Sequence, residues 1–181
     1  RTPRSSYMES ITDINEVSLA ALRVRVTKVF PAQIRSCLEE LNDEQLWWRP
    51  NDQSNSVGNL ALHVSGAMMH FLCRGVGGFD YVRDRPAEFA TRSMPKQQLL
   101  EMFDDVVSKA EQTFAGISVD RLSDPSTEPT YYSMIFEDLL GIAIHIAVHT
   151  GQIVYITKLL KEGSINELWM ATHRSHGAWK Q

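Results

Sequence analysis

Apolar residues recur along this chain at the three- and four-residue spacing of an α-helix, and no segment alternates in the two-residue period of a β-strand. Four segments carry the helical pattern, and we expect one long helix in each. They cover approximately residues 13–41, 54–75, 93–116 and 133–161. Pro31 falls inside the first segment and predicts a kink or a break there, because proline cannot donate the backbone hydrogen bond of a helix. The pattern therefore predicts an all-α fold.

Two longer connections separate these helices, and both are rich in turn-forming residues. They cover residues 76–92 and 117–132, which is long for helices joined directly end to end, so at least one should cross the end of the fold. We therefore expect a bundle of about four helices over residues 13–165. Residues 1–12 are expected to be disordered or left over from cloning, and residues 166–181 to form a C-terminal tail.

The composition is that of an ordinary soluble domain. The 181 residues are 43% hydrophobic and 22% charged, enough for one domain with a sizeable core. A net charge of −4 without any run of Lys or Arg argues against nucleic-acid binding. No uninterrupted apolar stretch reaches the ~18 residues of a membrane span, so we expect no membrane partner. Cys37 and Cys73 are too few for a disulfide framework, and we expect reduced thiols packed as small hydrophobes in a cytoplasmic protein.

Three histidines carry the candidate chemistry. His145 and His149 are four residues apart among apolar neighbours, so both imidazoles should lie on one inward helix face. Polar groups buried without partners cost about 1–3 kcal/mol each, and a divalent metal ion is the simplest partner for the pair. His63, in the apolar segment NLALH, is the natural third ligand. The alternative is a set of hydrogen-bonded core histidines without a metal.

Three neutral imidazoles make an open site of the catalytic type, since they leave positions for exchangeable ligands. Imidazole suits Zn, Ni, Cu and Fe, and the sequence does not rank them. The histidine pair reads HIAVH, not HExxH, which excludes the glutamate base of zinc metalloproteases. No Glu-x-x-His occurs, which argues against a di-iron carboxylate bundle. We therefore expect a mononuclear site.

Three further residues fall near the predicted metal face. Asn59 is four residues before His63 and Gln152 is three after His149, so each is a candidate for a hydrogen bond that orients a ligand imidazole. The alternative for both is ordinary helix polarity or a hydrogen bond to a neighbouring backbone group. His70 is seven residues after His63, on the same face and about 10.5 Å along the axis. It is too far to be a ligand but is a candidate catalytic residue for proton transfer, with a packing role as the alternative.

The charged stretch of residues 83–88 alternates in sign, which predicts an exposed salt-bridged turn worth only ~0–1 kcal/mol. Neither Lys nor Arg lies on the predicted metal face of the last helix. An anionic substrate would therefore depend on arginines of this stretch, Arg83 or Arg85. Trp47 and Trp48 are expected to cover the end of the bundle, with the mouth of a pocket as the alternative. His173 and His176 fall in the tail, where we expect no second metal site.

Several motifs taken together are recognisable. The stretches NSVGNLALH, GVGG, RDRPAEF and HTGQIVYITKLL, preceded by LWWRPN, occur in this order over residues 46–160. In these motifs the chain resembles the DinB-like superfamily, and within it an uncharacterised bacterial branch. The resemblance implies a four-helix bundle in up-down-down-up order that is usually a dimer. It also implies a divalent metal ion held by one histidine of the second helix and two of the last, which here are His63, His145 and His149.

The resemblance leaves the reaction open. The superfamily includes thiol-dependent enzymes, such as mycothiol-dependent maleylpyruvate isomerase and bacillithiol transferases, beside many members of unknown activity. We therefore expect a homodimer that binds one divalent ion, Zn or Ni first and Fe or Mn as alternatives. The expected activity is hydrolysis, or transfer of a group onto a low-molecular-weight thiol, with a small-molecule substrate. The alternative is a non-catalytic metal-binding or stress-response protein.

Overall fold

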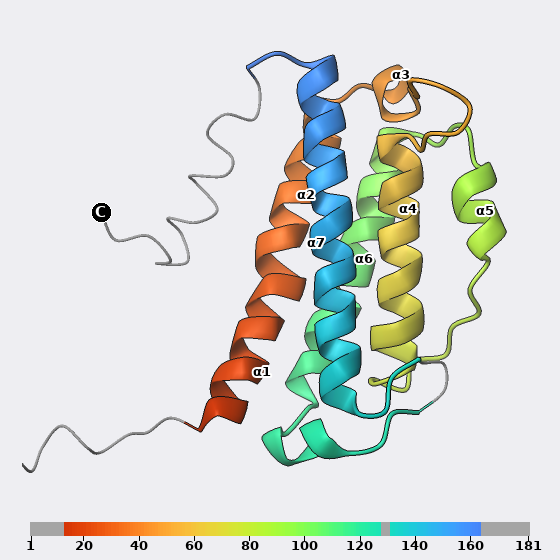
Figure 1. Cartoon of the computed structure of the whole chain (residues 1–181). Coiled ribbons are helices and arrows are strands. Elements are labelled where there is room, and N and C mark those ends of the chain that lie inside the picture. The colour runs from red at the N-terminus through yellow and green to blue at the C-terminus, as the bar shows by residue number, and fades with distance from the viewer. Residues whose placement is uncertain (1–12, 128–130, 164–181) are drawn as a thin grey trace, which may run out of the picture.

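The computed structural model describes residues 13–127 and 131–163. Over these residues the protein is helical and has no β-strand. One isolated β-bridge joins Pro125 and Met134. Four long helical segments lie side by side (Figure 1). They are α1 (Ile14–Val24) with η1 (Arg25–Val29) and α2 (Phe30–Glu40); α4 (Val57–Ala67) with η2 (Met68–Arg74); α6 (Lys96–Ala115); and α7 (Ile135–Leu160). The predicted all-α fold is confirmed. The predictions for residues 1–12 and for the tail, with His173 and His176, lie outside the described residues.

The first helical segment passes Pro31 without a break. Immediately before it, η1 forms a π-helical turn, in which the Phe30 N–H bonds to the carbonyl of Arg25, five residues back. A regular helix would press the proline ring against the carbonyl four residues earlier. The wider turn relieves this contact, and α2 begins with Pro31 in its first turn. The expected irregularity at Pro31 is therefore a widened turn in a continuous helix.

Short helices occupy the connections between the long segments. They are α3 (Asp43–Leu46), α5 (Arg85–Ala90) and the 3₁₀ turn η3 (Val119–Ser123). Figure 1 shows α5 standing beside α4 on the outer edge of the molecule. The side chain of Asp84 caps α5 by accepting from the Ala87 N–H, and Pro86 lies in its first turn. The region 76–92, expected to be a surface loop, therefore contributes a packed helix beside the second long segment.

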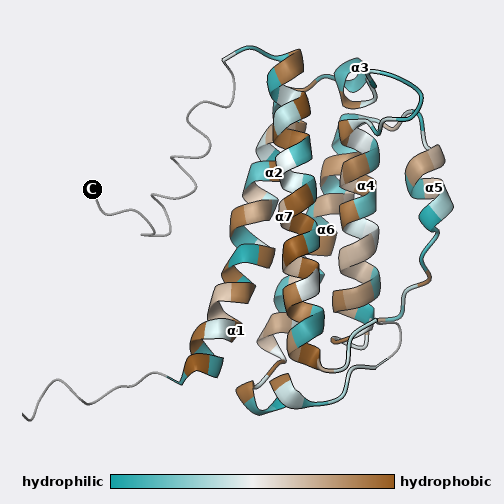
Figure 2. Ribbon diagram, in the orientation of Figure 1, coloured by the Kyte–Doolittle hydropathy of each residue, from teal (hydrophilic) through white to brown (hydrophobic). Residues whose placement is uncertain are grey.

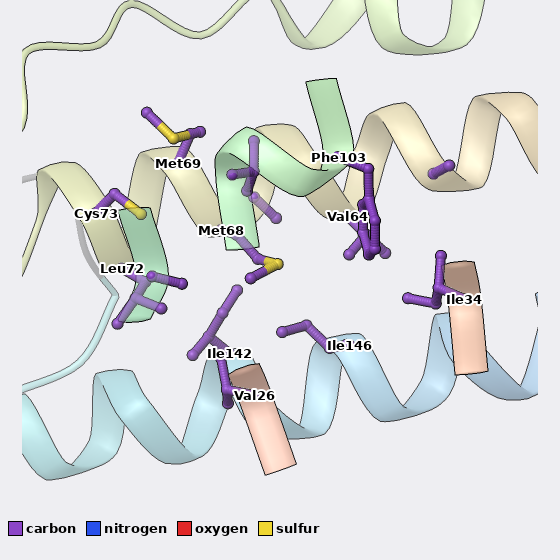
Figure 3. Packing of buried hydrophobic residues seen from close by; sticks show 14 of the residues in the cluster. Val26, Ile34, Val64, Met68, Met69, Leu72, Cys73, Phe103, Ile142 and Ile146 are labelled. Atoms are coloured by element: carbon purple, nitrogen blue, oxygen red, sulfur yellow. The ribbon is translucent and has the colours of Figure 1, made fainter. Parts of the chain in front are cut away.

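The core lies between the four long segments (Figure 3). Phe103, Ile34, Met68 and Ile146 are each fully enclosed in it. Cys37 and Cys73 are free thiols in the same core, which confirms their predicted role as small hydrophobes. Burial raises the pKa of both thiols to about 11, so they stay protonated at neutral pH.

Helix α7 is the most apolar of the long helices, as the brown turns along it in Figure 2 show. By length and composition alone it is the one described helix that meets the criterion for crossing a membrane. The core helix of a water-soluble protein meets the same criterion. Here α7 packs against α2 and α4 and buries Leu139, Ile146 and Ile153 completely. Part of the apolar surface of α7 is therefore buried in the core of the protein.

Candidate metal centre

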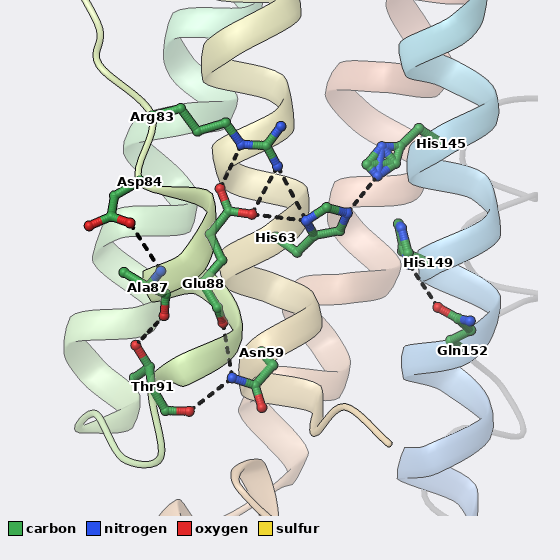
Figure 4. A network of polar contacts seen from close by, with 10 residues as sticks. All are labelled: Asn59, His63, Arg83, Asp84, Ala87, Glu88, Thr91, His145, His149 and Gln152. Carbon is green, nitrogen blue, oxygen red and sulfur yellow. Dashed lines mark hydrogen bonds and ion pairs between the residues drawn. The ribbon is translucent and has the colours of Figure 1, made fainter. Parts of the chain in front are cut away.

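Three histidines from two helices converge on one point. His63 projects from α4 toward His145 and His149 of α7 (Figure 4). The Nε2 atoms of His63 and His145 are 3.1 Å apart, and the candidate ligand atoms of all three residues lie within 4.8 Å of one another. The structure thus brings together the three residues that the sequence predicted as ligands.

The geometry fits a metal ion. Imidazole nitrogens bound to zinc at about 2.0–2.1 Å in a tetrahedral arrangement lie about 3.3 Å from each other. The 3.1 Å separation of the His63 and His145 Nε2 atoms is close to that spacing. His149 lies one helical turn beyond His145, its ring centroid 4.5 Å from that of His145. With their candidate ligand atoms within 4.8 Å of one another, the three histidines could hold one metal ion.

A buried carboxylate fixes the orientation of His63. Its Nδ1 atom lies 2.9 Å from Oε2 of Glu88, on α5. An ionised carboxylate only accepts hydrogen bonds, so Nδ1 carries the proton and Nε2 keeps its lone pair. That lone pair points toward His145. A carboxylate behind a ligand histidine is a recurrent arrangement in metalloproteins, because it holds the tautomer and raises the basicity of the ligand.

Arg83 holds Glu88 in place. Its Nε and Nη2 atoms lie 2.7 and 2.8 Å from the two carboxylate oxygens, and only 9% and 8% of the two side chains is exposed. Residues 84–87 are exposed as predicted, but the predicted exposure of the salt bridge within this stretch, Arg83–Glu88, is wrong. This salt bridge is a buried ion pair, because α5 packs against α4. Substitution of either residue should destabilise the protein, because removing one partner leaves an uncompensated buried charge.

Gly66 makes this approach of α5 to α4 sterically feasible. A Cβ atom built at Gly66 would lie 2.0 Å from Oε1 of Glu88 and 3.3 Å from Nε of Arg83. The ion pair therefore occupies the space beside α4 that any other side chain would fill. Gly66 lies three residues after His63, so the glycine that admits the pair and the ligand that uses it share one helix face.

The prediction that Asn59 bonds to a ligand nitrogen is wrong. Its amide nitrogen donates to the backbone carbonyls of Glu88 and Thr91, at 3.0 and 2.9 Å. Its amide oxygen accepts from Ser56, in the capping box that begins α4. Asn59 lies in the first turn of α4, where these backbone groups use its hydrogen-bonding capacity. These hydrogen bonds fix the C-terminal end of α5 against α4, and α5 carries Glu88.

Gln152 lies beside His149. Its Oε1 atom is 2.7 Å from Nδ1 of His149 (Figure 4). An amide oxygen accepts, so Nδ1 of His149 donates and its Nε2 is left as the ligand atom. This is the relationship that the spacing of the two residues in the sequence suggested. Glu88 and Gln152 thus set the tautomers of two of the three histidines.

His70 is not among the lining residues of the cavities beside His145 and His149, and its part in proton transfer stays a prediction. It lies in η2, where its ring contacts Phe71 at a centroid distance of 4.8 Å, and among the described residues its buried Nδ1 has no hydrogen-bond partner. The cavity beside His145 is lined by Phe71 instead. The prediction assumed a regular α-helix, whereas the π-helical turn places more residues in each turn and moves later side chains around the axis.

The electrostatics keep His63 and His145 neutral. Burial, and then the neighbouring His149 and His63, lower the pKa of His145 to about 4. Burial also lowers the pKa of His63, although its hydrogen bond to Glu88 opposes this effect. At neutral pH both rings are therefore uncharged, with one nitrogen free to bind a metal ion.

Two cavities flank the three histidines. One, of about 390 Å³, is lined in part by His149, Gln152, Tyr155 and Trp48. The other, of about 160 Å³, is lined in part by His145. His149 and His145 thus each face a separate space, so a ligand at the centre can extend in two directions. Trp48 belongs to the wall of the larger cavity, whereas Trp47 packs on Gly58 and donates its indole N–H to the carbonyl of Met94.

A family model matches most of the chain. Residues 14–174 match the family described as Protein of unknown function (DUF1572). The chain belongs to this family. None of the curated proteins matches it.

In this DUF1572 chain, the sequence reasoning missed Glu88 and its pairing with Arg83, which had been considered only as a cation for an anionic substrate. Both lie in a stretch interpreted as an exposed turn, and their charges gave no sign of burial. One signal was present: Asp84 followed by Pro86 is typical of a capped helix start. Recognising α5 there would have placed Glu88 on a helix, although not beside His63.

Proposed function

We propose that this DUF1572 protein binds one divalent metal ion, Zn or Ni, through His63, His145 and His149, and uses it to hydrolyse a small organic substrate. The observation that carries the proposal is the convergence of three imidazoles on one point, with His149 and His145 each lining a cavity. A structural metal site is closed by protein ligands, whereas three imidazoles beside accessible space suit exchange of a fourth ligand.

We also propose that the fold is the DinB-like four-helix bundle in up-down-down-up order. The course of the chain in Figure 1 supports this order: α1 and α2 run upward, α4 and α6 downward, and α7 upward again. In this arrangement the second and last segments are neighbours, and they carry the three histidines. Two buried free cysteines suit a reducing compartment, so we propose a cytoplasmic location.

When bound, a divalent ion in this site supplies a Lewis acid that makes water or a thiol reactive at neutral pH. The protein's own groups hold and orient it: Glu88 and Gln152 fix the ring tautomers of His63 and His149. In the hydrolysis of an ester or amide, the water oxygen bonds to the carbonyl carbon. The bond to the leaving oxygen or nitrogen breaks with its electron pair, and a proton from the water goes to the leaving atom.

Charge favours hydrolysis over transfer to a low-molecular-weight thiol. Such thiols are anionic, and a buried anion needs a cationic partner. Neither cavity has Lys or Arg among the described residues of its lining. Arg83 is the basic residue that reaches a ligand histidine, with Nη2 3.2 Å from Nδ1 of His63, and it is already paired with Glu88. It therefore has little capacity left to bind a substrate carboxylate.

The test is metal content followed by activity. Protein purified without an affinity tag is analysed for metals beside a His145→Ala/His149→Ala variant and a His70→Ala control. We expect about one divalent ion per chain in the wild type and in the control, and none in the double variant. The loaded protein is then screened for hydrolysis of uncharged esters and amides. An empty wild type as stable as the double variant contradicts the metal site. A loaded protein without hydrolytic activity supports the non-catalytic alternative.

A further inference from the structure

The two cavities and the histidines follow one stripe of α7. Ile142, His145, His149, Gln152 and Ile156 are three or four residues apart, so they lie along one side of the helix. The smaller cavity includes Ile142 and His145, and the larger one includes His149, Gln152 and Ile156. An elongated molecule lying along this stripe would thus place its middle at the histidines and one end in each cavity.

The larger cavity has the size and lining of a small-molecule pocket. Its volume of about 390 Å³ is in the range of ligand sites in proteins. Trp48 and Tyr155 contribute aromatic surface, and 38% and 65% of these side chains is exposed. Large exposed aromatic groups beside a candidate centre favour contact with a planar apolar group. Most of the remaining lining is aliphatic or carries uncharged polar groups, among them the amides of Gln53, Asn55 and Gln152.

Among the residues that the structure describes, the lining of the larger cavity contains no Asp, Glu, Lys or Arg. The neighbouring Arg49 points to Asp52, with Nη2 3.7 Å from the carboxylate. A charged group placed in this cavity would lose water without gaining a partner of opposite charge. Gln53, Asn55 and Gln152 instead offer amide groups, which hydrogen-bond well to neutral carbonyl, amide or hydroxyl groups.

We propose that the substrate is uncharged and carries an aromatic or similarly planar apolar group, which occupies the cavity lined by Trp48 and Tyr155. The reacting carbonyl lies at the three histidines. The smaller cavity, of about 160 Å³, limits the other end of the substrate to a group of about the size of benzene. This inference rests on the proposed function, because it assigns the substrate class of the same centre.

Three hydroxamates test the inference with zinc-loaded protein, because a hydroxamate chelates zinc whatever group it carries. Acetohydroxamate reports the open metal site alone, benzohydroxamate adds a neutral ring, and 4-carboxybenzohydroxamate adds a charge to that ring. Calorimetry gives each affinity. The chain has four tryptophans, so the part of the fluorescence change that Trp48→Ala removes is the part that reports Trp48. We expect benzohydroxamate to bind at least about tenfold more tightly than acetohydroxamate, through burial of the ring. The carboxylated ring should lose most of this advantage.

Matched variants locate the ring. Trp48→Ala and Tyr155→Ala should each reduce the preference for benzohydroxamate and leave the acetohydroxamate affinity unchanged. Tyr131→Ala, in the lining of the smaller cavity, should leave the preference unchanged. The inference is overturned if the two neutral hydroxamates bind equally, if the carboxylated ring binds best, or if Tyr131→Ala alone removes the preference.

Failure of the proposed function has a different signature. If the protein takes up no zinc, or if loaded protein binds not even acetohydroxamate, the open metal site itself is contradicted, and the inference is overturned with it. Metal content and acetohydroxamate affinity thus test the centre, whereas the ratio of the two neutral hydroxamates tests the pocket.

Discussion

The Nδ1 atom of His63 lies 2.9 Å from a carboxylate oxygen of Glu88, although the two residues belong to different helices and are 25 positions apart. This contact determines which nitrogen of His63 faces the other two histidines. It also links the candidate centre to α5 and, through Glu88, to Arg83. The centre therefore extends beyond the three ligands to a buried ion pair that orients one of them.

Glu88→Gln should lower zinc affinity about 10- to 100-fold, the usual effect of losing a group that orients a ligand histidine. The amide keeps the shape of the side chain but removes the charge that holds the Nδ1 proton and pairs with Arg83. Competition with a chromophoric chelator measures the affinity, and circular dichroism checks the fold. The control is Glu101→Gln, on the exposed side of α6, which should change nothing. Equal affinities for Glu88→Gln and wild type would contradict the role of Glu88.

Gly66→Ala should weaken both metal binding and stability. The added methyl group would lie 2.0 Å from Oε1 of Glu88, so the buried pair must move, at a cost typical of overpacking, about 1–3 kcal/mol. Gly151→Ala is the matched control, because a Cβ at Gly151 meets no atom within 4 Å. Alanine there should stabilise α7 by up to ~1 kcal/mol. Urea unfolding of the metal-free proteins and zinc titration measure both effects. Similar results for the two variants would contradict the requirement for glycine at position 66.

The long helices and the histidine cluster were predictable because both depend on local spacing. Apolar positions every three or four residues mark the long helices, and the i, i+4 pair His145 and His149 must share a face. His63 was predictable as the third ligand because its neighbours are equally apolar. The position of Gln152 beside His149 followed from the same helical periodicity.

What the sequence did not predict depends on departures from regular geometry and on long-range contacts. His70 was placed by counting regular helical turns, and η2 is wider than a regular turn. Asn59 was placed on the metal face, but its bonds go to the carbonyls of Glu88 and Thr91, about thirty residues away. The burial of Arg83 and Glu88 depends on the space left by Gly66, which becomes visible only when α4 and α5 are packed together.

The metal-free protein should lose stability as the pH falls from about 6.5 toward 4. The pKa of His145 is lowered to about 4 in the folded protein, by burial first, whereas an unfolded histidine titrates near 6.5. Between these values the unfolded chain binds more protons, so stability rises with pH in this range. Allowing for the partial exposure of the ring, we expect a contribution of about 1 kcal/mol between pH 7 and pH 5.

Urea unfolding of wild type and His145→Gln across this pH range measures the effect. The variant should show a flatter profile between pH 5 and 7, because its side chain does not titrate. Groups such as Glu111, whose pKa is lowered by the hydrogen bond from Lys28, titrate at lower pH and are common to both proteins. If the unfolding free energies of the two proteins changed with pH in parallel, His145 would not be the cause of the pH dependence.

The protein should be a homodimer that pairs through α7. Leu140, Ile144 and Val148 are four residues apart on this helix and are 40%, 56% and 56% exposed in the part of the chain that the structure describes. An exposed apolar stripe of this kind is typical of an interface between protein molecules. Sedimentation at micromolar concentration should give a dimer, and Ile144→Gln/Val148→Gln should shift it to monomer. Because His145 and His149 are unchanged in this variant, its metal content should stay the same. Val82→Gln, at a loop position that is 87% exposed, is the control and should remain dimeric. A monomeric wild type, or a double variant that still dimerises, would contradict pairing through α7.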